Sequence, residues 1–195
     1  LVSALMYTNP MMIYFGQELG EKGMDAEGFS GEDGRTTIFD YWTVDTIRRW
    51  RNNGKFDQKL LTEDELSLQE YYAKVLNICN SSEAVREGEF YDLMYVNPQL
   101  QKQYTFVRHS EKETLLVIAN FASQATEITI NVPEHLFEYY GIKENTACEW
   151  TDLLSGSQIT TAFSSNMPTK LNVPSWGGCI LKMKSVKKAG KKTKS

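Results

Sequence analysis

Cysteine is scarce in this sequence, and its three cysteines lie far apart, at Cys79, Cys148 and Cys179. An odd number of cysteines at such wide spacing argues against a disulfide framework and against a cysteine-ligated zinc site. We therefore expect all three side chains to be small, buried, apolar groups.

Signals of several other protein classes are missing as well. The sequence has no internal repeat and neither of the glycine-rich patterns that bind phosphates, G-K-[S/T] and G-x-G-x-x-G. A net charge of −4 gives no electrostatic reason to expect nucleic acid. Residues 1–10 are too short a run to cross a membrane and lack the basic leader of a signal peptide, so we interpret them as the end of a longer buried helix. We expect neither a nucleic-acid nor a membrane partner.

The remaining composition is that of a globular protein. Hydrophobic residues make up 41% and charged residues 24% of the 195 positions, which suffices for one core or two small ones. Aromatic residues reach 12%, with ten tyrosines and four tryptophans. Aromatic faces stack on the apolar faces of sugars, but they also fill ordinary cores, so both uses stay open.

The most informative stretch spans residues 9–42. Residues 11–15 (MMIYF) form a short apolar run, which is typical of a strand buried on both faces of a parallel sheet. Gly16, Gln17 and Glu18 follow at once and begin a long, acidic, glycine-rich loop. In α/β folds and (β/α)₈ barrels, polar residues just past the carboxyl end of a strand belong to the functional site.

This stretch resembles a known family. Residues 10–18 (PMMIYFGQE) are similar to the last barrel strand of the α-amylase family, glycoside hydrolase family 13, which typically reads P-x-(apolar)₂-Y-[YF]-G-[QDE]-E. Residues 34–37 (GRTT) resemble the loop that follows this strand in the family. The resemblance reaches to about Lys184, because a long helix and a series of strands follow in the family's order.

The order of the expected elements supports the resemblance. Thr43 is an N-cap for a helix over residues 44–52, and Thr62 with Glu65 forms a capping box for a longer helix to about residue 80. After residue 89 the apolar period changes to two, which predicts an antiparallel β-sandwich. The predicted strands are residues 90–96, 104–108, 114–120, 127–132, 148–152, 158–162, 170–173 and 178–184.

We thus predict a mixed α and β fold: a remnant of the last β/α unit of a (β/α)₈ barrel, followed by a Greek-key β-sandwich of about eight strands. Residues 1–86 would be the partial end of the catalytic barrel and residues 87–185 the sandwich. Residues 186–195 form a basic tail, which we expect to be disordered.

The resemblance implies that the catalytic residues lie elsewhere. A retaining glycosidase uses two carboxyl groups about 5–5.5 Å apart, and the family places them on earlier barrel strands. A His-Asp motif also precedes the strand seen here, yet neither His109 nor His135 is followed by Asp. We therefore assign no catalytic residue and expect this chain alone to be inactive.

The loop is nevertheless expected to line the substrate cleft. Arg35 can donate paired hydrogen bonds to sugar hydroxyls or to a site carboxylate, or else pair with nearby acidic residues. Glu18, beside Gln17, is either a site group or a structural carboxylate. Tyr41 and Trp42 form either a stacking wall or a hydrophobic plug. The candidate substrate-binding residues are Arg35, Gln17, Glu18, Tyr41 and Trp42.

Two further interpretations concern metals and the sandwich. We predict no cofactor, although the carboxylates of the loop could bind calcium in a parent enzyme; they are Glu18, Asp25, Glu27, Glu32 and Asp33. In the sandwich, Trp150 and Trp176 are each either a sugar-stacking residue or a packing residue.

The resemblance implies the C-terminal portion of an α-amylase-like enzyme that cleaves α-glucosidic bonds in starch-type glucans by a retaining double displacement. Its partners would be an α-glucan or maltooligosaccharide and the remainder of the barrel, and two copies could pair through exposed barrel elements. The alternative is a non-catalytic carbohydrate-binding or structural β-sandwich module.

Overall fold

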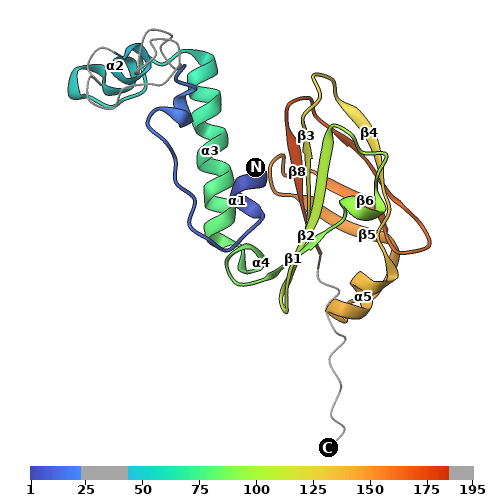
Figure 1. Ribbon diagram of the computed structural model, residues 1–195. Helices are drawn as coiled ribbons and strands as arrows, with labels where there is room; N and C mark the ends of the chain where they lie inside the picture. The colour runs from blue at the N-terminus through green and yellow to red at the C-terminus, as the bar shows by residue number, and fades with distance from the viewer. Residues whose placement is uncertain (23–43, 185–195) are drawn as a thin grey trace, which may run out of the picture. The chain divides into compact units, whose positions relative to one another are not determined.

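The computed structural model describes residues 1–22 and 44–184, and the chain forms two units. One unit contains residues 1–9 and 78–195, and the other contains residues 10–77 (Figure 1). The expected N-cap at Thr43 and the expected disordered tail lie outside the described residues.

The larger unit is built on an antiparallel sandwich. Its six-stranded sheet has the order β1-β2-β3-β8-β5-β6, and β4 pairs with β7 in a second sheet. The strands are β1 (Glu89–Asp92), β2 (Gln103–Ser110), β3 (Glu113–Asn120), β4 (Thr126–Ile130), β5 (Asn145–Asp152), β6 (Gln158–Phe163), β7 (Thr169–Val173) and β8 (Gly178–Met183). The prediction of an eight-stranded sandwich is confirmed. Only the first strand is clearly shorter than predicted, because the Asp92 side chain accepts the Met94 N–H at 2.8 Å and a 3₁₀ turn, η3 (Met94–Val96), follows.

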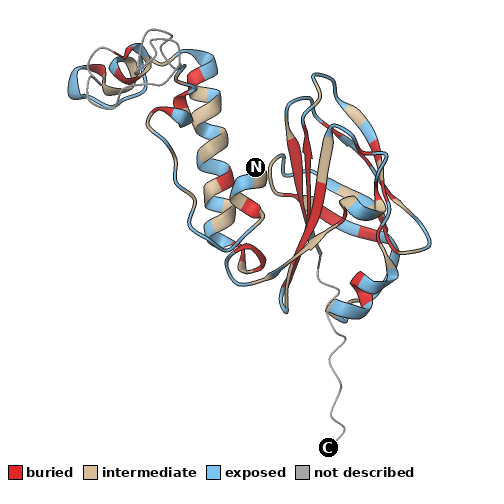
Figure 2. Ribbon diagram, in the orientation of Figure 1, coloured by how far each residue is buried: buried red, intermediate tan, exposed pale blue. Residues whose placement is uncertain are grey.

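The core lies between the two sheets. Strand β3 is buried at every position, because it lies in the sheet between β2 and β8 (Figure 2). Trp150 and Phe163 meet edge to face at 5.2 Å in this core, and both are fully buried. Alternating residues of β7, Thr169, Leu171 and Val173, point inward, as the period of two predicts.

Helix α5 (Glu134–Tyr140) was not predicted from the sequence. It begins after Pro133 and ends at Gly141, which adopts the left-handed conformation at φ 63°. Leu136 and Phe137 anchor it in the sandwich core. The proline before this segment and the glycine after it are helix boundary signals that could have revealed it.

A short helix, α4 (Glu83–Arg86), is held at both ends by the sandwich. At its start, the Glu113 carboxylate accepts the Ser82 hydroxyl at 2.5 Å and the Ala84 N–H at 3.1 Å. Burial opposes ionisation of Glu113, but these bonds and the ion pair with Lys182 at 2.6 Å outweigh it and lower the pKa of this carboxyl. A negative charge at a helix N-terminus also complements the helix dipole.

At the other end of α4, the buried side chain of Arg108 donates to four backbone carbonyls. Its guanidinium nitrogens lie 3.0 Å from the Ala84 oxygen, 2.9 Å from Val85, 2.7 Å from Gly88 and 3.0 Å from Met6. These carbonyls include groups that the end of the helix leaves unpaired. Arg108 thus ties α4 and the first residues of the chain to the sandwich.

The smaller unit contains two helices, α2 (Asp45–Arg51) and most of α3 (Glu63–Ser81). The predicted capping box is confirmed, since the Thr62 N–H donates to Glu65 at 2.8 Å and the Glu65 N–H donates to the Thr62 hydroxyl at 3.2 Å. This unit also has two short 3₁₀ helices, η1 (Gln17–Leu19) and η2 (Asn52–Gly54), whereas α1 (Val2–Leu5) belongs to the larger unit.

The predicted strand over residues 11–15 is not a strand in this structure. A parallel barrel strand is stabilised by hydrogen bonds to neighbours on both sides, and no described residue pairs with this segment. The chain instead turns at Tyr14, whose carbonyl accepts the Gln17 N–H at 3.0 Å. The conformation of this apolar run therefore depends on neighbouring strands that the run itself does not provide.

Candidate functional site

The described part of the predicted site is a turn bracketed by two glycines. Gly16 and Gly20, at φ 73° and 70°, enclose the helical turn η1. A side chain at Gly16 would bring a Cβ within 2.7 Å of the Glu21 Cβ, so the turn requires glycine there. Leu19 anchors the turn in a small core with Val44 and Ile47.

Both the oxygen and the nitrogen of the Gln17 side-chain amide form hydrogen bonds. Its Oε1 accepts the Tyr14 N–H at 3.1 Å, and its Nε2 donates to the Tyr72 hydroxyl of α3 at 2.8 Å. The side chain is exposed yet has a defined orientation, as a residue that binds a ligand needs. Glu18 is half-exposed beside it, and within the described residues its carboxylate has no hydrogen bond or ion pair.

The other three candidate residues, Arg35, Tyr41 and Trp42, lie outside the described residues. So do the expected calcium ligands other than Glu18: Asp25, Glu27, Glu32 and Asp33. Over residues 1–22 and 44–184, no group of three His, Cys, Asp or Glu side chains is placed to hold a metal ion.

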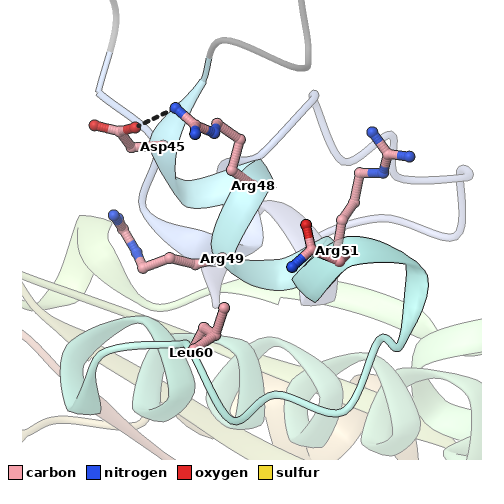
Figure 3. A pocket seen from close by; sticks show the side chains of 6 residues that line it. Asp45, Arg48, Arg49, Arg51 and Leu60 are labelled. Atoms are coloured by element: carbon pink, nitrogen blue, oxygen red, sulfur yellow. Dashed lines mark ion pairs between the residues drawn. The ribbon is translucent and has the colours of Figure 1, made fainter.

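Helix α2 lines a basic cavity of about 490 Å³ that sequence reasoning missed (Figure 3). Its lining residues are Asp45, Arg48, Arg49, Arg51, Asn53 and Leu60. Arg48 pairs with Asp45 at 3.7 Å, as the dashed line in Figure 3 marks. The run of arginines in RRWR, residues 48–51, was the available signal.

Charge in this cavity is partly compensated. Arg49 forms a forked ion pair with Glu65, whose Oε2 lies 3.0 Å from the Arg49 Nε. The pairing raises the pKa of Arg49 and lowers that of Glu65. Glu65 also caps α3, so this ion pair fixes α2 against α3.

The two tryptophan candidates of the sandwich separate clearly. Trp150 is fully buried, so the packing interpretation holds and it cannot stack on a sugar. Trp176 is 72% exposed and lies in a turn, where its φ is 47°. Its backbone N–H donates to the Ala122 carbonyl at 2.9 Å.

The cysteines are free thiols, as expected. Cys148 and Cys179 are buried, and burial raises their pKa values to about 11 and about 12. Cys79 is only half-buried, and its thiol donates to the Ala4 carbonyl at 3.3 Å. Among the described residues, no helix is both long and apolar enough to span a membrane.

Comparison with known proteins bears on the sandwich first. Residues 93–180 match the family described as "Maltogenic Amylase, C-terminal domain". The sandwich is thus similar to the C-terminal domain of maltogenic amylases. The match begins at Leu93, just after β1, and ends within β8, so it covers most of the larger unit. No curated protein matches the sequence.

Solved α-amylase structures share the fold over nearly the whole chain. An Anoxybacillus α-amylase has a TM-score of 0.52 at 16% identity, over 93% of this chain and 31% of its own. AmyP, solved with maltose, has a TM-score of 0.59 at 14% identity, over 92% of this chain and 32% of its own. The α-amylase of Geobacillus thermoleovorans, solved with acarbose, has a TM-score of 0.55 at 12% identity, over 94% of this chain and 32% of its own.

The resemblance to the C-terminal part of an α-amylase is thereby confirmed for the fold. This chain spans about a third of the length of these solved structures. At such low sequence identity, the similarity establishes the fold but not the reaction that the protein catalyses.

Proposed function

We propose that this chain is the C-terminal portion of an α-amylase-like glycoside hydrolase that cleaves α-glucosidic bonds in starch-type glucans. The supporting observation is that similarity to α-amylases covers 92–94% of the chain, and so includes the helical unit as well as the sandwich. A detached sugar-binding sandwich would share only the second part. On this proposal, residues 1–86 complete the end of the barrel and residues 87–185 form the domain after it.

The proposed reaction is a double displacement that retains the anomeric configuration. One carboxyl group attacks the sugar and another donates a proton to the leaving oxygen, and both come from earlier barrel strands. The part played by this chain is to bind and orient the substrate. Gln17 would present its amide from the turn anchored by Tyr14 and Tyr72, with Glu18 beside it.

The remaining proposed contacts come from the loop after this turn. Arg35 would donate two hydrogen bonds to sugar hydroxyls or to a catalytic carboxylate. Tyr41 and Trp42 would form an aromatic wall. Calcium bound by the loop carboxylates, and pairing of two copies through barrel elements, remain proposals for the parent enzyme.

A second candidate function is a non-catalytic carbohydrate-binding module. It is favoured by exposed aromatic side chains on the sandwich, among them Tyr95, Tyr139 and Trp176. The two functions differ in turnover, since a binding module retains glucan without cleaving it.

The test is hydrolysis by the product of the complete reading frame that contains these residues. We expect release of reducing sugar from soluble starch, with the α-anomer appearing first by NMR. The 195-residue chain alone should release none. First appearance of the β-anomer would contradict the retaining mechanism, and absence of turnover on any α-glucan would contradict the proposed activity.

Replacement of Arg35 by alanine should impair turnover much more than folding. A charge-assisted hydrogen bond contributes about 1.5–3 kcal/mol, so we expect kcat/KM to fall by about ten- to a hundredfold. A surface ion pair would contribute only about 0–1 kcal/mol to stability. Kinetics and denaturation midpoints of the same variant separate these roles. A sharp fall in the midpoint, with kcat/KM within about threefold of wild type, would make Arg35 structural.

A further inference from the structure

Both histidines and four of the ten tyrosines gather at one place on the sandwich, although they come from four separate segments. We call this group the tyrosine–histidine cluster, and its members are Tyr91, Tyr95, His109, His135, Tyr139 and Tyr140. They belong to β1, η3, β2 and α5, and β1 and α5 lie toward the same end of the sandwich in Figure 1. Only the tertiary fold brings these residues together.

Tyr91 is the centre of the cluster. Its hydroxyl lies 2.9 Å from the Tyr95 hydroxyl and 3.1 Å from Nδ1 of His135. Its ring centroid is 6.4 Å from that of Tyr95 and 6.5 Å from that of Tyr139. The hydrogen bonds of the Tyr91 hydroxyl therefore orient the rings of Tyr95 and His135 before any ligand binds.

The cluster has an inner and an outer layer. His109 and Tyr140 are half-buried with ring centroids 4.4 Å apart, and they support the rings above. Tyr95 and Tyr139 are 62% and 58% exposed, and His135 is exposed and stacked on Tyr139 at 5.9 Å. Such large exposed rings leave apolar faces in contact with water while their polar edges are already paired.

We propose that the tyrosine–histidine cluster is a surface binding site for α-glucan chains on the sandwich. The exposed faces of Tyr95 and Tyr139 would stack on the apolar faces of glucose units. The phenol hydroxyls and the imidazole of His135 would hydrogen-bond to sugar hydroxyls. The identity of the sugar rests on the proposed function, whereas the site itself rests on this geometry.

The chemistry of the cluster favours a neutral, hydroxyl-rich ligand. The cation that acts on the cluster is Arg108, near Tyr140, and its buried guanidinium already donates to backbone carbonyls, so it is not available to bind a phosphate. The Glu89 carboxylate lies close enough to Tyr139 to raise the pKa of its phenol, and a carboxylate there would repel an anion. Fixed rings also lose little side-chain entropy on binding, which favours a weakly held, repetitive ligand.

Native gel electrophoresis of the 195-residue chain through soluble starch tests the proposal. Starch should slow the wild-type chain, and a carboxymethylcellulose gel should slow it much less. Tyr95→Ala and Tyr139→Ala should each weaken the affinity by about two- to tenfold, and the double variant by about the product. Phe121→Ala is the matched control, because Phe121 is 56% exposed outside the cluster, and it should leave the affinity unchanged.

Tyr91→Phe examines the hydrogen-bond network separately. It keeps the ring but removes the hydroxyl shared with Tyr95 and His135, so the affinity should fall while the melting temperature stays near that of wild type. Near-UV circular dichroism verifies that every variant is folded.

Four outcomes would overturn the surface site: no retardation of wild type, wild-type binding by the double variant, an equal loss with Phe121→Ala, or a loss confined to Trp42→Ala. Retardation without hydrolysis by the complete gene product would refute the proposed activity alone. Hydrolysis without retardation of this chain would refute the surface site alone.

Discussion

Replacing Arg108 with alanine is expected to lower the free energy of unfolding by about 3–5 kcal/mol, because four hydrogen bonds from a buried guanidinium to backbone carbonyls are lost. Arg108 is 2% exposed, and its donors pair with backbone carbonyls of Met6, Ala84, Val85 and Gly88. Without the guanidinium these carbonyls lose their donor, and a buried unpaired polar group costs about 1–3 kcal/mol. Chemical denaturation of the whole chain measures the change.

Two variants sharpen this measurement. Arg108→Lys keeps the charge but not the planar fork, so it should recover only part of the loss. Arg86→Ala removes an arginine whose side chain is 51% exposed and which pairs with Glu87 at 3.6 Å, and it should cost less than about 1 kcal/mol. A loss below about 1 kcal/mol for Arg108→Ala would show that the carbonyls find other donors, and that α4 does not depend on this side chain.

The second large effect is expected in the core of the sandwich. Trp150→Ala should lower the free energy of unfolding by about 3–5 kcal/mol, since it leaves a cavity beside Phe163. Trp150→Phe should cost clearly less than Trp150→Ala, because it keeps one aromatic ring and removes only the rest of the indole, including an Nε1 that is buried without a hydrogen-bond partner among the described residues.

Trp176→Ala is the matched control for Trp150→Ala, since the same side chain is removed from a position that is 72% exposed. Its effect on stability should stay within about 0.5 kcal/mol. Thermal and urea unfolding of the three variants provide the comparison. Similar losses for Trp150→Ala and Trp176→Ala would contradict the burial assigned to these two residues.

Local patterns in the sequence determined the elements of the sandwich. A period of two marks strands such as β7, because alternate side chains of a strand point to opposite faces, whereas β3 is buried throughout. The capping box at Thr62 and Glu65 likewise depends on residues three apart, and it forms as predicted. The strand motif at residues 10–18 led to the α-amylase resemblance, which the sandwich and the solved structures support.

Of the predicted site, Gln17 and Glu18 lie on the turn η1 after the apolar run, whereas the sequence predicted them at the end of a strand. It could not say that residues 11–15 would lack strand pairing, because the partners of a strand come from elsewhere in the chain or from another chain. The roles of the other predicted site residues, Arg35, Tyr41 and Trp42, stay predictions.

Tertiary structure alone decided which polar and aromatic residues matter. Arg108 reaches the carbonyl of Met6, 102 positions away, and Tyr91 meets His135, 44 positions away. Trp150 and Trp176 are the same residue type, yet Trp150 is buried in β5 and Trp176 is exposed in a turn. Secondary structure follows from spacing between near neighbours, whereas burial and hydrogen-bond partners depend on contacts between distant segments, and these exist only once the sheets have packed.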